Sequence, residues 1–297
     1  MLVTGAHGFV AGSVLAQAGA EWEVHAVSRA GPGSRSDRLC WHVCEPLERN
    51  QLADLFHRVS PDALIHTAAI ADIDLAEKQP ELARAVNVDL TRSLVSLCVQ
   101  AGCKLVLCST DTIFDGEHAP YDEEDLPGPV NHYAETKVEA EQNVSGLGAQ
   151  AVIARLSLVV GLPIMGSGNS LLARMLPALK EGRPIAAPAQ EVRTPVDVIT
   201  AGRALLELAA GNHHGIFHLA GHDRLNRLEI AQKIARRFGF SGDLVIAQPA
   251  KALAGRAVRP RDVSLNTAKA SAELETPMRT LDDGLSLILE ATEALCL

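Results

Sequence analysis

Tyr133 and Lys137 are residues whose types and spacing could carry acid–base chemistry. They stand four apart in "NHYAETKVEAE", residues 131–141, and residues at i and i+4 share one face of a helix. A phenol has a pKa near ~10. A neighbouring ammonium stabilises the phenolate and lowers that pKa, which makes tyrosine a usable proton donor to a carbonyl. The spacing alone favours an ordinary exposed helical pair. The surrounding sequence therefore has to show whether the two residues belong to an active site.

Polar side chains follow the strand-like run "KLVLCST". Ser109, Thr110 and Asp111 stand where that run ends, and open α/β sheets bind their ligands at the carboxyl ends of parallel strands. A hydroxyl at this place could hydrogen-bond a reacting carbonyl while Tyr133 supplies the proton. This context favours an active site over a surface pair.

A glycine-rich loop, "VTGAHGFVAGS", joins the first strand-like run to a helical pattern. Gly5 and Gly8 let the backbone turn tightly and approach a pyrophosphate. The helix that starts at Phe9 and Val10 offers free N–H groups and the positive end of its dipole. The loop therefore predicts dinucleotide binding, with a purely structural strand–helix turn as the alternative.

The end of the second strand predicts which dinucleotide is bound. An acidic residue there would bind the ribose hydroxyls and favour NAD, but this chain has Ser28 and Arg29 in "VSRAGPGSR". A guanidinium suits a 2′-phosphate, which it can grip in a bidentate manner. We therefore expect NADP(H) to be preferred and NAD(H) to be possible, the alternative being that Arg29 is a solvated loop residue.

Short apolar runs without alternation alternate with helical patterns in the first two-thirds of the chain. Such runs are typical of parallel strands covered on both faces. The succession predicts an α/β fold with a doubly wound parallel sheet, the NAD(P)-binding Rossmann fold. The expected strands lie within 1–5, 23–28, 63–69, 104–110 and 151–160, and the expected helices at about 9–20, 48–58, 80–101 and 132–145.

The regular alternation ends after Gly161. We expect a loop over 161–170, a helix over 171–182, a strand within 215–221 and an amphipathic helix over 225–240. The predicted Rossmann domain spans 1–161, with 191–221 returning to it. Residues 162–190 and 222–297 would form a smaller, mixed C-terminal substrate-binding part.

Charge and cysteine content exclude several classes of protein. The net charge of −9 argues against binding to nucleic acid or to anionic membranes, and no apolar run approaches the length of a membrane span. The six cysteines at 40, 44, 98, 103, 108 and 296 form no CxxC pair. Reduced thiols, a cytoplasmic location and no metal are expected, with a zinc site as the minor alternative.

The motifs together resemble the extended short-chain dehydrogenase/reductase family, and are most similar to its dTDP-4-dehydrorhamnose reductase branch. They are the glycine loop, "STDTIFDG", "PYDEEDLPGPVNHYAETK" and "TPVDV". The resemblance implies a reductase that uses NAD(P)H to reduce a keto group of a nucleotide-activated deoxysugar, and a homodimer as the common assembly. It also implies site residues: Thr110, Tyr133 and Lys137 for catalysis, Lys137 also for the nicotinamide ribose, Ala68 and Ala69 beside the cofactor, and Asp111 beside the sugar.

The sequence departs from this branch around the expected sugar site. Thr112, Leu158 and Ile70 stand where the branch usually carries aromatic residues, and Asp72 adds a carboxylate. We expect Thr112, Leu158 and Asp72 to contact the substrate together with Asp111. The smaller, more aliphatic walls predict poor activity on dTDP-4-dehydrorhamnose itself. They would suit a different sugar, for example one with an amino group that Asp72 could pair with.

Two other functions remain open on the same fold. The first is a nucleotide-sugar epimerase or dehydratase that keeps its cofactor tightly bound. The second is a non-catalytic, dinucleotide-binding subunit similar to the regulatory beta subunit of methionine adenosyltransferase. The intact Thr110, Tyr133 and Lys137 set speaks against the second.

Overall fold

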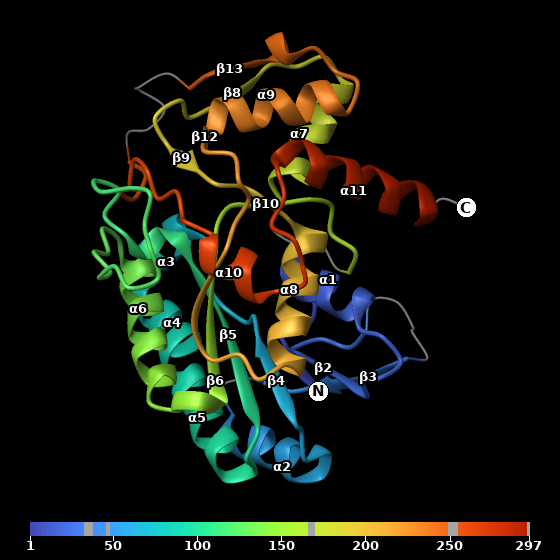
Figure 1. Cartoon of the computed structure of the whole chain (residues 1–297), viewed down its shortest axis with the longest axis vertical. Helices are drawn as coiled ribbons and strands as arrows, with labels where there is room; N and C mark the ends of the chain where they lie inside the picture. Colours follow the sequence, from blue (N-terminus) through green and yellow to red (C-terminus); the bar gives the residue numbers. More distant parts are fainter. Residues whose placement is uncertain (33–37, 46–47, 166–169, 249–254, 296–297) are drawn as a thin grey trace.

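A seven-stranded parallel sheet forms the centre of the larger part of the molecule (Figure 1). The computed structural model describes residues 1–32, 38–45, 48–165, 170–248 and 255–295. The strands lie in the order β11-β6-β5-β4-β1-β2-β3. The chain builds the sheet outward from β1 to β3 on one side, and then from β4 to β11 on the other side of β1. This is the doubly wound arrangement that the sequence predicts. The strands are β1 (Leu2–Thr4), β2 (Val24–Ser28), β3 (Leu39–Val43), β4 (Ala63–His66), β5 (Lys104–Thr110), β6 (Ala151–Leu156) and β11 (Gly215–Leu219).

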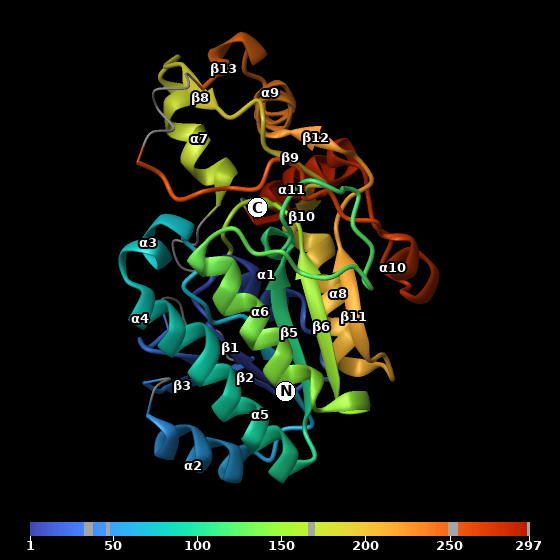
Figure 2. The same cartoon turned by 90° about the vertical axis from the view of Figure 1, so that its left-hand side faces the viewer.

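Helices cover both faces of this sheet (Figure 2). One face packs on α1 (Phe9–Gln17) and α8 (Val198–Ala210), and the other on α2 (Arg49–Val59), α5 (Leu90–Ala101) and α6 (His132–Ser145). Neighbouring residues of a strand point to opposite faces. Val3 accordingly joins the first of these two cores and Leu2 the second. Burial on both faces explains why these strands are continuous apolar runs.

Several local expectations need correction. The helix expected over 80–101 is divided into α4 (Pro80–Arg84), a π-helical turn over Ala85–Asp89 and α5. The strand expected over 151–160 ends at Leu156, and Val159–Val160 form the separate β7. Strand β3 and helix α3 (Ile73–Lys78) were not expected. Strand β3 is an edge strand whose residues are all exposed or half-buried, although four of the five in "LCWHV" are apolar.

The smaller part has its own apolar core between three helices, α7 (Leu171–Lys180), α9 (Arg227–Arg237) and α11 (Leu281–Leu295). Figure 1 shows α7, α9 and β8 gathered beyond one end of the central sheet. Three short pairs of strands complete it, β10 with β7, β12 with β9, and β13 with β8. Their bounds are Ile185–Ala187 for β8, Val192–Arg193 for β9, Val196–Asp197 for β10, Leu225–Asn226 for β12 and Val245–Ala247 for β13.

The chain crosses between the two parts more than once. Segment 191–221 returns to the sheet, where α8 covers one face and β11 pairs with β6 in parallel. The later helix α10 (Ala268–Glu273) also packs on the first part, because Ala270 belongs to the sheet core. The exact domain boundaries stay a prediction. Among the described helices, none has the length and apolarity needed to cross a membrane.

Candidate active site

The glycine loop between β1 and α1 leaves no space for side chains. Gly5 has a φ of +72°, and a Cβ on it would lie 2.8 Å from the backbone nitrogen of Ala68. A Cβ on Gly8 would lie 2.8 Å from the carbonyl oxygen of Gly5. The loop therefore packs directly against the segment after β4, and larger residues would push the two apart.

The N-terminus of α1 is open to an anion. Gly8 is the N-cap residue and offers no side chain, and the first turn, which includes Phe9 and Val10, holds no acidic residue. Backbone N–H groups at such a helix end, together with the helix dipole, favour a bound phosphate. The loop and helix thus fit the pyrophosphate of a dinucleotide.

The predicted cofactor-selecting residues lie at the same edge of the sheet. Strand β2 pairs with β1 so that Thr4 stands beside Val27, which brings Ser28 and Arg29 level with the glycine loop. The Ser28 hydroxyl donates to the carbonyl of Ala30, and Arg29 is exposed. The Arg29 guanidinium is therefore exposed to solvent, at the place where an adenosine ribose is expected.

The structure brings Thr110, Tyr133 and Lys137 together. Thr110 ends β5, and its hydroxyl acts to lower the pKa of the Tyr133 phenol, while Tyr133 and Lys137 lie one turn apart on the buried face of α6. The Nζ of Lys137 donates to the carbonyl oxygen of Cys108, at 2.7 Å. Helix α6 begins where the Asn131 side chain accepts from the backbone N–H of Ala134, and this cap fixes the start of the helix that carries the pair.

The pKa of Tyr133 differs from the expectation that Lys137 would lower it. Burial instead raises the pKa of Tyr133, and the hydrogen bond from Thr110 only partly opposes this. Burial also lowers the pKa of Lys137. The Lys137 ammonium is not among the groups that shift the pKa of Tyr133, and its Nζ is held by the carbonyl oxygen of Cys108.

A pocket of about 310 Å³ opens in front of these residues. The start of α1 forms one side with Phe9 and Val10, and the ends of β5 and β6 contribute Thr112 and Leu158. The Thr112 and Thr110 hydroxyl oxygens are 3.0 Å apart and share a hydrogen bond. The pocket therefore joins the start of α1 to Thr110 and Tyr133. It also contains three of the predicted substrate residues, Asp111, Thr112 and Leu158.

Asp111 lies buried at the bottom of this pocket. Its carboxylate accepts a hydrogen bond from the Ser157 hydroxyl at 2.9 Å and pairs with the Nε of Arg193 at 3.6 Å. Burial raises the pKa of Asp111, and Arg193 opposes that rise. The predicted position beside a substrate is consistent with this geometry, but the carboxylate is already partnered within the protein.

Four arginines for which the sequence predicts no role line the pocket: Arg174, Arg193, Arg227 and Arg259. Glu191 stands among them, 3.6 Å from a guanidinium nitrogen of Arg227. The cations exceed the acidic groups here, although the chain as a whole is acidic. Each arginine comes from a different segment, so only the folded chain reveals the group. Clustered guanidinium groups suit phosphate oxygens.

Two predicted wall residues do not reach the pocket. Asp72 is exposed, and its carboxylate caps α3 by accepting from the backbone N–H of Leu75 at 2.9 Å. Ile70 packs beside Tyr133 in a small apolar cluster, and its backbone N–H is held by Asn87. Ala71 and Ile73 line the pocket instead. The expected pairing of Asp72 with a substrate amino group loses its geometric basis.

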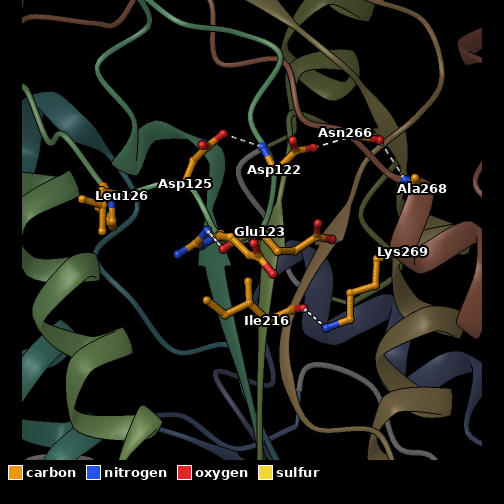
Figure 3. Close-up of a pocket in the computed structure, with 11 residues that line it drawn as sticks. Asp122, Glu123, Asp125, Leu126, Ile216, Asn266, Ala268 and Lys269 are labelled. Atoms are coloured by element: carbon orange, nitrogen blue, oxygen red, sulfur yellow. Dashed lines mark hydrogen bonds between the residues drawn. The ribbon is translucent and has the colours of Figure 1, made fainter.

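A larger hollow of about 690 Å³ lies elsewhere, between the acidic loop 122–125, β11 and α10 (Figure 3). Its polar side chains are largely paired within the protein. Asp122 accepts from the Asn266 amide at 2.7 Å, and Lys269 donates to the carbonyl of Ile216 at 2.8 Å. These contacts hold the loop in place, so this hollow has less to offer a ligand than the smaller pocket at Tyr133.

Comparison with known proteins places the chain in a family. The family model for the RmlD substrate binding domain matches residues 1–294. The chain belongs to this family. The resemblance inferred from the motifs is thereby confirmed, and the RmlD-type fold accounts for the seven-stranded sheet.

The proteins to which this chain is similar differ in function. A probable low-salt glycan biosynthesis reductase from Haloferax volcanii is 28% identical over 96% of both chains. Methionine adenosyltransferase 2 subunit beta from Pongo abelii is 30% identical over 91% of this chain and 80% of its own. The crystal structure of dTDP-4-dehydrorhamnose reductase from Bacillus anthracis in complex with NADP superposes with a TM-score of 0.86, at 23% identity over 98% of both chains.

Proposed function

We propose that this RmlD-family chain is an NAD(P)H-dependent reductase that acts on a keto group of a nucleotide-activated deoxysugar. The observation that carries the proposal is the pocket that Thr110 and Tyr133 line together with the start of α1 and the four arginines, with Lys137 one helical turn from Tyr133. The reductases among the relatives support the same activity.

The residues around the glycine loop fit a bound NADP(H). The N–H groups at Phe9 and Val10 would hold the pyrophosphate, and Gly5 and Gly8 allow it to approach. At the other positions, Arg29 would hold the 2′-phosphate with Ser28 beside it, Ala68 and Ala69 would line the cofactor, and Lys137 would hold the nicotinamide ribose. When bound, the cofactor supplies a hydride.

Residues of this chain supply the proton that the substrate carbonyl takes up. Because burial raises the pKa of Tyr133, the phenol stays protonated at neutral pH, as a proton donor must. Thr110 lines the same pocket as the phenol and can orient a carbonyl oxygen beside it. The Lys137 ammonium lies one helical turn away and stabilises negative charge that develops on the phenol oxygen.

The residues that line the pocket favour a substrate in which an unusual sugar is linked to a nucleotide. Arginines such as Arg174 and Arg227 suit a diphosphate. Around the expected sugar, Thr112 and Leu158 offer little surface for stacking a ring, and Phe9 and Tyr133 are the aromatic side chains among the described lining residues. Poor placement by about an ångström can cost roughly a hundredfold in rate, so we expect weak turnover of dTDP-4-dehydrorhamnose.

The test is a screen of NADPH oxidation against a panel of 4-keto and other keto sugars linked to nucleotides. Turnover of at least one of them, with dTDP-4-dehydrorhamnose below a specificity constant of ~10⁴ M⁻¹s⁻¹, is the expected result. A higher value for that substrate would refute the specificity prediction but not the reductase. Binding of NADP without turnover of any sugar would refute the reductase.

The similarity to methionine adenosyltransferase 2 subunit beta supports a second candidate, a dinucleotide-binding partner protein. NADP binding without turnover in the screen would favour it. An epimerase or dehydratase would instead purify with nicotinamide absorbance that dialysis does not remove. An exchangeable cofactor is what a reductase requires.

A further inference from the structure

Metal-type ligands converge at the edge of the central sheet, away from the pocket. The sequence has Glu23 and His25 in "EVH" and Cys40 and His42 in "CWH". Strands β2 and β3 are parallel, with His25 directly beside Cys40. Since residues two apart along a strand point to the same face, the pairing brings all four side chains to one face of the sheet.

The donor atoms are close enough to share one ion. One ligand atom each from Glu23, His25 and Cys40 lie within 4.8 Å of one another, and the His25 Nε2 is 3.2 Å from a Glu23 carboxylate oxygen. Bonds of ~2.0–2.3 Å in a tetrahedral zinc site put its ligand atoms roughly 3.4–3.6 Å apart. Small rotations of the two exposed side chains would close that difference.

His42 supplies the support that a metal-bound imidazole needs. Its Nε2 is 2.9 Å from the Nδ1 of His25. A ligating histidine usually donates its other ring N–H to a neighbouring acceptor, which fixes its tautomer and orientation. Here a proton on Nδ1 of His25 would be donated to His42, and Nε2 would be left free to bind the ion.

Burial divides the cluster into a fixed part and an accessible part. The side chain of His25 is only 11% exposed, whereas that of Glu23 is 79% exposed, and Cys40 is exposed as well. An ion can therefore arrive from solvent onto a held imidazole.

We propose that Glu23, His25 and Cys40 bind a zinc(II) ion, with His42 as the residue that positions His25. Carboxylate, imidazole and thiolate are all zinc ligands, and a water molecule would complete four-coordination. The Cys40 thiol loses its proton to solvent when the zinc–sulfur bond forms. The charges of Arg58 and the amino terminus, which act on the two histidines, oppose the ion, so we expect a moderate affinity.

The site is independent of the proposed reductase. It lies near the start of β2 and β3, while the cofactor residue Ser28 ends β2 and Arg29 follows it. The test therefore uses the reduced full-length chain without any histidine tag, and cobalt(II) as the probe. A cobalt–thiolate charge-transfer band that saturates at one ion per chain is expected. Zinc affinity is then measured by displacement of cobalt.

Cys40→Ser should abolish the band, while Cys44→Ser, at a thiol near the end of the same strand, should keep it. Glu23→Gln should weaken cobalt binding at least tenfold, and His42→Ala by about 10–100-fold, the usual scale for a supporting residue. Cys40 and Glu23 are exposed, so their variants should fold, which circular dichroism checks. No band in the parent chain, or a band that survives Cys40→Ser, would overturn the site; cobalt held only by other exposed histidines would lack the thiolate band.

Discussion

At the scale of single residues, Tyr133 shows how burial sets the chemistry of the site. Its phenol is almost fully buried between Thr110 and a small apolar cluster that includes Ala76 and Ala83. Desolvation raises its pKa, so the residue starts in the protonated form. Its proton can be lost only if charge that develops on the phenol oxygen is stabilised, which is the role proposed above for the Lys137 ammonium.

The first prediction concerns that proton. Tyr133→Phe keeps the ring packing and removes only the hydroxyl. Turnover of the substrate found in the screen should fall by roughly a hundredfold or more, the usual scale of general acid catalysis, while NADP binding and the urea midpoint change little. Steady-state kinetics and cofactor titration measure both. Unchanged turnover would return Tyr133 to a purely structural role.

Arg29 carries the second prediction, on cofactor choice. Its guanidinium is exposed after β2 with no acidic residue beside it in the sequence. A charge-assisted contact is worth about 1.5–3 kcal/mol, so Arg29→Ala should lower the preference for NADPH over NADH by roughly tenfold or more. NADH affinity should stay nearly constant. Titrations with both cofactors check this, and equal losses for the two would show that Arg29 does not bind the 2′-phosphate.

At the scale of elements, a buried ion pair fixes α6, the helix that carries Tyr133, to the sheet. Glu141 lies on α6, one turn beyond Lys137, and its carboxylate binds Arg155 of β6 at 2.9 Å. The Ser109 hydroxyl of β5 donates to the same carboxylate. Helix α6 is thus tied to the two strands whose ends form the pocket, and the position of Tyr133 depends on this connection.

The third prediction tests that connection. Glu141→Ala leaves the Arg155 charge buried and unpaired, which typically costs about 3–5 kcal/mol. Glu139→Ala on the same helix is the matched control, since Glu139 pairs with Arg84 where both side chains are at least 40% exposed. The control should change the free energy of unfolding by less than about 1 kcal/mol. Urea denaturation compares the two, and similar losses would contradict the proposed anchor.

At the scale of the whole molecule, one ion pair fastens the C-terminal segment over the first part. Arg259 holds Asp74 of α3 through two hydrogen bonds of 2.8 and 2.7 Å. Next to it, the Asn131 side chain donates to the carbonyl of Val258 at 3.0 Å. The residue that caps the catalytic helix therefore also holds the segment that carries a pocket arginine, so the two parts of the molecule are coupled at the site.

The fourth prediction is a pH dependence of this fastening. The hydrogen bonds from Arg259 lower the pKa of Asp74 to about 2, below the ordinary value of ~3.9. A depressed pKa in the folded state contributes stability that is complete above the ordinary pKa and is lost as the pH falls through the folded one. The parent chain should therefore exceed Asp74→Asn in urea midpoint at neutral pH.

That difference should shrink between about pH 4 and pH 2. Asp54→Asn, on an exposed position of α2, serves as the control and should follow the parent chain throughout. A difference between the parent and Asp74→Asn that is independent of pH would show that Asp74 acts by packing or by its backbone contacts rather than by its charge.

Local patterns in the sequence determine the central sheet and the catalytic candidates. The apolar runs, the glycine loop and the Tyr133–Lys137 spacing depend on residues close to one another in the chain, and each is interpreted through one strand, one turn or one helix face. The sheet, the loop and α6 accordingly agree with the prediction. Edge strand β3 was not expected, although four of the five residues in "LCWHV" are apolar.

Only the tertiary structure decided which residues from distant parts of the sequence lie close together. The pocket arginines Arg174 and Arg259 are 85 positions apart in the sequence, and no local pattern links them. Asp72 carried a plausible charge but was used to cap α3, since the first turn of a helix competes for a nearby carboxylate. The Glu23, His25 and Cys40 cluster exists because of the register of β2 on β3, and register is a property of paired strands, not of either sequence alone.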